Sequence, residues 1–411
     1  MKKFWKNILI ISVLLFLFSF NFHFVYGTSE VSNLSSSSVF LMDNRTNKVL
    51  YSKNENEKMY PASTTKILTA ILTLENSNLD DIVTASYDSV MSIPDGYSTA
   101  NIQIGEQLTV EQLLQMLLVH SANDAANILA EHVGGSIDSF VSMMNTKLNE
   151  LGLYDSHFTN TYGKHDENHY TTAHDLAYLF KYCLNNETFR KIAGSASCAI
   201  PTTNESESRL YTSTNELLNP NSQNYYKYLT AGKTGYTTQA KECLVSSAYK
   251  DNLELISVVL GSTNRFYDTK NLFEYGFSNY EVKNIVSAND VVSQIEVSNG
   301  TKDTRHLDLL VKETIPALVK SSETNLELNP NIHLNDNISA PISENQTLGT
   351  VTYEINGVEY TTDLISSHAV EKSKMLEYIL YIGILLVVLI LFYEFSSLKK
   401  NNRKKFKRYK R

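Results

Sequence analysis

The stretch Pro61-Ala62-Ser63-Thr64-Thr65-Lys66 is the most informative part of this 411-residue chain. Apolar residues follow it at helical spacing, so Ser63 and Lys66 lie three positions apart at the start of a predicted helix. Side chains with this spacing share one helix face about 5–6 Å apart. An unprotonated lysine amine can then accept the proton of a serine hydroxyl, which predicts a nucleophile and its base. Ser63 taken alone is equally well explained as a helix N-cap.

Two further motifs follow in the chain. Ser121-Ala122-Asn123 lies at a break between two predicted helices, 113–119 and 125–132. Lys233-Thr234-Gly235 comes just before a predicted strand, where a lysine, a hydroxyl and a glycine that admits a ligand close to the backbone favour anion recognition. Taken singly, the first motif is also explained as an N-cap and the second as an ordinary strand start.

The segments around these motifs predict an α+β domain over residues 30–280. A hairpin over 39–51 comes first, and strands at 243–248 and 253–260 come last. Apolar residues recur at helical spacing between them and predict helices at 63–74, 109–119, 125–132, 140–151 and 174–184. This order predicts one antiparallel sheet that is completed by both ends of the domain, with helices on both sides.

The composition changes near Val282. Short apolar runs alternate with turns rich in Asn, Asp, Gly and Pro, and the strands that they predict span 291–297, 307–311, 349–355 and 358–362. We therefore predict a separate, small all-β domain over residues 282–367.

Both ends of the chain carry membrane signals. Residues 1–27 have a basic start, an apolar stretch and a small residue at Gly27, which predicts a secretory signal peptide; an uncleaved anchor is the alternative. Near the other end, the uncharged run 378–393 predicts a transmembrane helix over residues 376–395. The positive-inside rule then places the basic tail, 396–411, in the cytoplasm and the body of the chain outside the cell.

The composition excludes some functions. The net charge is −8, although nine of the 36 Lys and Arg residues lie in the last thirteen positions. An acidic body with a basic end argues against nucleic acid as a partner and fits attachment to a membrane.

The three cysteines, Cys183, Cys198 and Cys243, are too few for a disulfide framework, and the spacings of common zinc sites are missing. We predict no metal and no cofactor, and expect the cysteines to pack in the interior.

In combination, the three motifs resemble those of the penicillin-recognising serine enzymes. The neighbouring residues narrow the resemblance to the D-alanyl-D-alanine carboxypeptidases, low-molecular-mass penicillin-binding proteins that trim peptidoglycan stem peptides. The segments that carry it are 61–66, 121–126, 169–175 and 233–237. It covers about residues 35–280 and continues through the β domain to the anchor. It implies a serine β-lactamase/transpeptidase-like fold for the first domain.

The resemblance also implies a mechanism. Ser63 is expected to attack the carbonyl between the last two D-alanines of a stem pentapeptide, with Lys66 as general base. A lysine in water has a pKa near 10.4, so Lys66 needs burial and a neighbouring cation, expected to be Lys233, to be neutral at pH 7. Ser121 is expected to relay the proton to the leaving amine, and Asn123 to hold a substrate amide and orient Lys66.

The remaining candidate residues are expected to bind the substrate. The backbone N–H groups of Ser63 and Tyr236 are expected to form the oxyanion hole, beside Gly235. Thr234 and Arg265 are the candidates for holding the free terminal carboxylate, and the planar fork of arginine suits this task. The alternative for Arg265 is a surface turn residue.

Other functions stay open at this point. A β-lactamase would share the catalytic groups, but it needs a fast route for water to the acyl-enzyme and normally lacks the β domain and anchor. A membrane-tethered peptidoglycan-binding protein with a catalytically weak site is a second alternative, and a D,D-endopeptidase a third. The expected partners are peptidoglycan stem peptides, β-lactam antibiotics as covalent inhibitors, and the bacterial cell membrane, which the chain crosses once with its catalytic domain outside.

Overall fold

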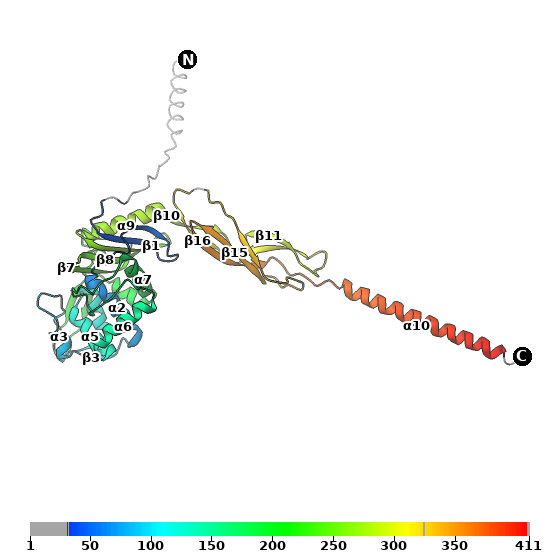
Figure 1. The fold of residues 1–411 in the computed structure, drawn as a ribbon, viewed down its shortest axis with the longest axis horizontal. Coiled ribbons are helices and arrows are strands. Elements are labelled where there is room, and N and C mark those ends of the chain that lie inside the picture. Colours follow the sequence, from blue (N-terminus) through cyan, green and yellow to red (C-terminus); the bar gives the residue numbers. More distant parts are fainter. Residues whose placement is uncertain (1–30, 32, 324, 409–411) are drawn as a thin grey trace, which may run out of the picture. The chain divides into compact units, whose positions relative to one another are not determined.

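A computed structural model describes residues 31–408 of the chain except residues 32 and 324. The predicted signal peptide lies outside the described residues. The chain divides into two compact units, Met1–Glu281 with Lys320–Thr324 and Val282–Val319 with Asn325–Arg411. Each unit has its own hydrophobic core. Figure 1 draws the helices and strands of both units as a ribbon.

The first unit is built on a five-stranded sheet. Its strands are antiparallel in the order β2-β1-β9-β8-β7, and their bounds are β1 (Ser38–Asp43), β2 (Val49–Lys53), β7 (Leu229–Thr237), β8 (Lys241–Lys250) and β9 (Leu253–Ser262). Because β1 pairs with β9, for example Phe40 with Val258, the two ends of the unit complete one sheet. This prediction is confirmed.

Helices cover both faces of the sheet. Phe40 and Leu41 are adjacent in β1, so their side chains point to opposite faces. The ring of Phe40 contacts Tyr178 of α7 (Ala173–Leu184), whereas Leu41 lies against Gly276 of α9 (Arg265–Asn279), where an added Cβ would be 3.3 Å from its Cδ2. The predicted α+β class with helices on both sides is therefore confirmed. Helix α9 itself was not predicted.

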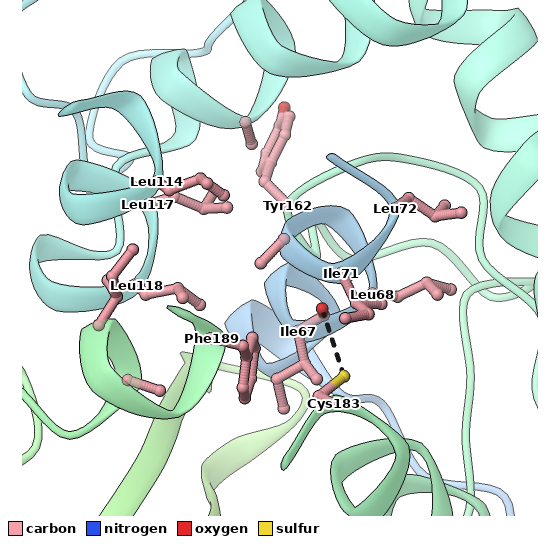
Figure 2. Packing of buried hydrophobic residues seen from close by; sticks show 14 of the residues in the cluster. Ile67, Leu68, Ile71, Leu72, Leu114, Leu117, Leu118, Tyr162, Cys183 and Phe189 are labelled. Atoms are coloured by element: carbon pink, nitrogen blue, oxygen red, sulfur yellow. Dashed lines mark hydrogen bonds between the residues drawn. The ribbon is translucent and has the colours of Figure 1, made fainter. Parts of the chain in front are cut away.

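The remaining helices form a layer around α2 (Lys66–Asn76), in which eight successive residues from Lys66 to Thr73 are buried. Figure 2 shows the buried Ile67 of α2 between Phe189 and Cys183, whose thiol donates to the Ile67 carbonyl. Each such fully buried side chain contributes roughly 1.5–3 kcal/mol to folding. The surrounding helices are α4 (Val110–Gln115), η2 (Met116–His120), α5 (Asn123–Gly134), α6 (Ile137–Glu150) and α8 (Glu187–Ala193). Helix α2 is thus held rigidly along its length.

Local sequence signals account for several of the helix ends. Thr109 and Gln112 form a reciprocal capping box at the start of α4. Helix α5 ends at Gly134, and Gly135 follows with a φ of 72°, a left-handed conformation that glycine adopts without strain. The short elements of the unit are η1 (Ala62–Thr65), β3 (Ile82–Thr84), α3 (Tyr87–Met91), β4 (Gln107–Thr109), β5 (Ser197–Ile200), β6 (Arg209–Thr212) and η3 (Glu216–Leu218).

The second unit is mainly antiparallel β structure. Its five-stranded sheet has the order β11-β12-β16-β15-β14, and the strands are β11 (Val291–Glu296), β12 (His306–Val311), β14 (Asn331–Leu334), β15 (Thr347–Ile355) and β16 (Val358–Ser366). A further pair is formed by β10 (Tyr280–Val286) and β13 (Ile315–Lys320). Helix α10 (Met375–Arg408) follows, and its segment Glu377–Lys399 is long and apolar enough to cross a membrane.

Candidate active site

Ser63 lies in the short 3₁₀ turn η1, directly before α2. The preceding Ala62 has a φ of 48°, a left-handed conformation that costs a residue with a side chain about 1–3 kcal/mol. The Thr65 hydroxyl holds this conformation by donating to the Ala62 carbonyl at 2.8 Å. The N-cap of η1 is Pro61 and that of α2 is Thr65, so the N-cap explanation of Ser63 is wrong. The turn instead presents the Ser63 hydroxyl to Lys66.

Two glycines allow other segments to approach the Ser63 turn closely. A Cβ at Gly163, where φ is 90°, would lie 1.8 Å from the Ala62 carbonyl oxygen. A Cβ at Gly235 would lie 2.8 Å from the Pro61 oxygen and 3.0 Å from the Ser63 nitrogen. The edge strand β7 therefore passes directly beside the backbone N–H of Ser63.

Lys66 is completely buried, with an exposed fraction of 0%. Its Nζ lies 3.0 Å from the Ser63 Oγ, 2.5 Å from the Asn123 Oδ1 and 2.9 Å from the Tyr162 carbonyl oxygen. Burial, with the charge of Lys233 as a second cause, holds the pKa of Lys66 well below its usual range, although Asp124 acts in the opposite direction. The amine is thus placed to exchange a proton with Ser63 and is favoured in its neutral form.

Lys233 is 1% exposed and lies on β7. Its Nζ donates to the Ser121 Oγ at 2.9 Å and to the Thr234 carbonyl oxygen at 3.0 Å. Burial, and then the charge of Arg265, lowers the pKa of Lys233 to about 7. The three predicted motifs are therefore joined by hydrogen bonds, Ser63 to Lys66, Lys66 to Asn123, and Lys233 to Ser121.

Ser121 ends the π-helical turn η2 with a φ of 67°. A turn of this kind is often found at functional sites, because it redirects side chains between two helical segments. The next helix, α5, begins at Asn123, whose backbone N–H donates to the Ser98 carbonyl. Ala122 rather than Ser121 is the N-cap of α5, so the N-cap explanation of this motif is also wrong.

Arg265 is the first residue of α9 and lines the same cleft. Its backbone N–H donates to a Glu242 carboxylate oxygen, and its Nη1 donates to the Gly235 carbonyl, both at 2.9 Å. Burial lowers the pKa of Arg265 from its usual value. Its Nε is buried without a partner among the described residues. Thr234 lies nearby in the cleft, with its Oγ1 2.5 Å from the Thr214 Oγ1. Arg265 is thus part of the site rather than a surface turn.

The cleft has a volume of about 580 Å³. Seven of the nine predicted site residues line it, and these are Ser63, Ser121, Asn123, Thr234, Gly235, Tyr236 and Arg265. The other two, Lys66 and Lys233, are buried and contact lining residues. Every predicted site residue is therefore found in one constellation.

Sequence reasoning missed several groups of this site. The carbonyl of Tyr162 binds Lys66 through the backbone, which leaves no side-chain signal. Tyr97 lines the cleft, and its ring centroid lies 6.2 Å from that of Tyr162. His169 is buried, and its Nε2 lies 2.8 Å from the Thr65 hydroxyl. It stands in one of the segments that carried the family resemblance, which is the signal that could have identified it.

The cysteines are not placed for catalysis. All three are reduced and buried. Burial raises the pKa of Cys198 and of Cys243 to about 11, and that of Cys183 well above its usual range. Thiols of this kind are poor nucleophiles at neutral pH, which agrees with the predicted packing role. In the described part of the chain, no group of three or more His, Cys, Asp or Glu residues could hold a metal ion.

Comparison with known proteins identifies the class of this site. A family model described as D-alanyl-D-alanine carboxypeptidase matches residues 26–264, and one described as the C-terminal domain of penicillin-binding protein 5 matches residues 280–372. The chain is similar to the D-alanyl-D-alanine carboxypeptidase DacF of Bacillus subtilis, with 35% identity over 80% of this chain and 84% of that protein. It is 28% identical to DacA of Escherichia coli over 80% of this chain and 81% of that protein.

Solved structures agree. Penicillin-binding protein 5 of Haemophilus influenzae has a TM-score of 0.65 at 26% identity and covers 84% of this chain and 100% of its own. The regulatory factor PBP3 of Streptococcus pneumoniae has a TM-score of 0.68 at 26% identity and covers 82% of this chain and 100% of its own. The chain belongs to the D-alanyl-D-alanine carboxypeptidase family of serine peptidases. The predicted family, fold class and enzyme class are confirmed.

Proposed function

We propose that this protein removes the terminal D-alanine from peptidoglycan stem pentapeptides through an acyl-enzyme on Ser63. The observation that carries the proposal is the 3.0 Å contact between the Ser63 Oγ and the buried Nζ of Lys66. A neutral amine has two N–H groups and one lone pair. The carbonyl oxygens of Asn123 and Tyr162 match the two N–H groups, and the lone pair is then directed to the Ser63 hydroxyl.

Acylation follows from this arrangement. Lys66 takes the hydroxyl proton while the Ser63 Oγ bonds to the carbonyl carbon between the two D-alanines. The resulting oxyanion accepts hydrogen bonds from the backbone N–H groups of Ser63 and Tyr236, each worth roughly 3–4 kcal/mol in comparable enzymes. The tetrahedral intermediate then collapses, the C–N bond breaks, and the proton held by Lys66 passes through the Ser121 hydroxyl, which lies beside Lys233, to the leaving amine.

Deacylation reverses the proton transfers. Water, activated by neutral Lys66, attacks the ester carbonyl, and the proton returns to the Ser63 oxygen as the C–O bond breaks. Penicillin presents an amide carbonyl and a carboxylate in the same way. It is therefore expected to acylate Ser63 and to leave slowly, because its acyl group remains in the cleft.

Recognition of the terminal carboxylate is assigned to Arg265 and Thr234, with Asn123 holding a substrate amide. Among the described residues, the guanidinium of Arg265 donates one hydrogen bond, from Nη1 to the Gly235 carbonyl, which leaves Nη2 to bind a carboxylate in the cleft that Arg265 lines. A planar, bidentate donor suits a carboxylate. This requirement explains why an enzyme with this site acts at the end of a peptide chain.

We also propose that the protein is anchored in the bacterial cell membrane by the segment Glu377–Lys399 of α10, with its catalytic unit outside. The basic residues that follow this segment support a cytoplasmic tail. The peptidoglycan substrate lies on the same side of the membrane as a catalytic unit placed in this way.

The direct test is hydrolysis of diacetyl-Lys-D-Ala-D-Ala with mass spectrometry of the penicillin-treated protein. We expect release of D-alanine and a long-lived penicillin adduct on Ser63, both lost in Ser63→Ala. Rapid release of hydrolysed penicillin would instead indicate a β-lactamase. Binding of the peptide without release of D-alanine would indicate a wall-binding protein.

A further inference from the structure

The serine run Ser35-Ser36-Ser37-Ser38 precedes and enters β1. Its composition is that of a flexible linker, yet Ser36 and Ser38 are only 1% and 0% exposed. Each hydroxyl has a defined partner. That of Ser38 donates to the Asn54 carbonyl at 2.9 Å, and that of Ser37 contacts the Gly261 carbonyl at 3.4 Å. The hydroxyls of Ser35 and Ser36 bind a residue of helix α9.

Ser35 and Ser36 both bind the carboxylate of Asp268, a completely buried residue of α9. Its Oδ2 accepts from the hydroxyls of Ser35 at 2.8 Å, Ser36 at 2.5 Å and Ser262 at 2.8 Å, and its Oδ1 accepts from the Ser35 backbone N–H at 3.2 Å. A buried carboxylate needs donors that replace water. The serine segment supplies three of these four donors.

The same network holds the residues on both sides of Arg265. Upstream, the Ser35 hydroxyl accepts from the Thr263 backbone N–H at 3.1 Å, and the Ser262 hydroxyl accepts from that of Asn264 at 2.8 Å. Downstream, Asp268 lies in the first turn of α9. The backbone from 262 to 268 is therefore fixed to the N-terminal segment, with Arg265 in its middle.

We propose that Ser35, Ser36 and Asp268 form a positioning network that aims Arg265 at the terminal carboxylate of the substrate. The inference rests on the proposed function, because it takes Arg265 as the carboxylate-binding group. A bidentate contact depends on the angle of the guanidinium plane, so a small rotation of the first turn of α9 weakens it. The Ser63–Lys66 pair lies on η1 and α2, which have their own contacts. Loss of the network is then expected to reduce carboxylate selectivity rather than acylation chemistry.

The test compares two buried serines of one run in the full-length protein. Ser36→Ala removes a donor to Asp268, whereas the matched control Ser38→Ala removes a donor to Asn54. The measured quantity is the ratio of kcat/KM for diacetyl-Lys-D-Ala-D-Ala to kcat/KM for the same peptide with a terminal carboxamide. We expect Ser36→Ala to lower this ratio about tenfold, the effect of losing one hydrogen bond to a charged group. Ser38→Ala should leave it unchanged.

Three further variants make the result decisive. Asp268→Asn should lower the ratio further, and Ser36→Thr, which keeps the hydroxyl, should restore it. Arg265→Gln should remove the preference for the free carboxylate. If Arg265→Gln leaves the ratio unchanged, the carboxylate-binding role of Arg265 is wrong. If Arg265→Gln lowers the ratio but Ser36→Ala and Asp268→Asn do not, the positioning network alone is wrong. A general loss of stability would lower kcat/KM equally for the two peptides, in both Ser36→Ala and Ser38→Ala. This outcome would also contradict the positioning network.

Discussion

The Nζ of Lys233 lies 2.9 Å from the Oγ of Ser121, and both side chains are buried. The contact links a lysine of β7 to the turn before α5. Because burial and the charge of Arg265 lower the pKa of Lys233 to about 7, the charge on this lysine changes near neutral pH. The electrostatic support that it gives to a neutral Lys66 changes with it.

This relationship predicts an alkaline limb in the activity of the free enzyme. We expect kcat/KM to decline as pH rises through about 7, where Lys233 loses its proton. A bound carboxylate beside Arg265 stabilises the charged form of Lys233 and raises its pKa, so the corresponding limb in kcat should lie at higher pH. Both rates should be measured from about pH 5 to about pH 10, a range that covers the usual pKa of histidine and approaches that of lysine. If the alkaline limbs of kcat/KM and of kcat coincided, this account would be contradicted.

Asn123→Asp is predicted to disable the base. It replaces an amide oxygen 2.5 Å from the Lys66 Nζ by a carboxylate oxygen, which favours the protonated amine. Each unit by which the pKa of Lys66 rises above the assay pH lowers the neutral fraction about tenfold. The second-order rate of penicillin acylation should fall accordingly and recover at higher pH.

Asn127→Asp is the matched control. Asn127 is equally buried in α5, but its Oδ1 accepts from the Thr161 hydroxyl rather than from Lys66. An acylation rate that falls in both variants, without recovery at high pH, would point to a general packing defect.

Gly163→Ala is predicted to abolish penicillin labelling. Its Cβ would lie 1.8 Å from the Ala62 carbonyl oxygen, so the Ser63 turn must move. Gly152→Ala provides a comparison, because Gly152 has a φ of 74° but open space around its Cβ position. The second variant should lose only about 1–2 kcal/mol of stability from backbone strain, measured by urea denaturation, and should keep its labelling. Full labelling of Gly163→Ala would show that the turn tolerates displacement.

His169 is predicted to make the fold sensitive to acid. Burial lowers its pKa to about 3, below the usual value near 6.5. The unfolded chain therefore binds a proton at higher pH than the folded one, and the free energy of unfolding should decrease as pH falls from 6.5 toward 3. One such group contributes a slope of at most about 1.4 kcal/mol per pH unit. The check is the urea midpoint of the wild type and of His169→Gln, measured between about pH 7 and about pH 4. Because the histidine pKa in the unfolded chain is ~6.5, the difference between the two midpoints should become smaller as the pH is lowered.

A chain that ends after Ser373 is predicted to be soluble and active. It lacks the apolar segment Glu377–Lys399 and retains all residues of the cleft. Fractionation of cells should move the protein from the membrane to the soluble fraction without a change in kcat/KM. Retention of the shortened chain in the membrane fraction would assign the anchor to another segment.

Much of the composition of the candidate site could be predicted because it depends on side chains at short spacing. Ser63 and Lys66 are three positions apart, a spacing that a helix presents on one face, and Ser121 and Asn123 lie together at the break before α5. The sheet was also predictable, since the strands at the two ends of the unit are short, mainly apolar runs with turn residues between them. Bringing the motifs together required the family resemblance, because no local rule places Lys233 beside Ser121.

The missed features depend on the backbone or on distant partners. The Tyr162 carbonyl acts without its side chain. Ala62 and Ser121 adopt left-handed conformations that these residue types do not favour. Helix α9 was not recognised because only part of one face is apolar, with Leu272 and Phe273 buried. Asp268 gains its importance from serines more than two hundred residues earlier in the chain.

The pairing of β1 with β9 also has a consequence for the order in which the protein matures. Strand β1 is synthesised first, but its partner β9 is one of the last strands of the unit. One edge of β1 therefore stays unpaired until the chain has been synthesised as far as residue 262. Arg265 and β7 reach their places only then. A nascent chain that stops short of Arg265 therefore lacks a completed cleft. The cleft is completed in a single late step, after the whole unit has been synthesised.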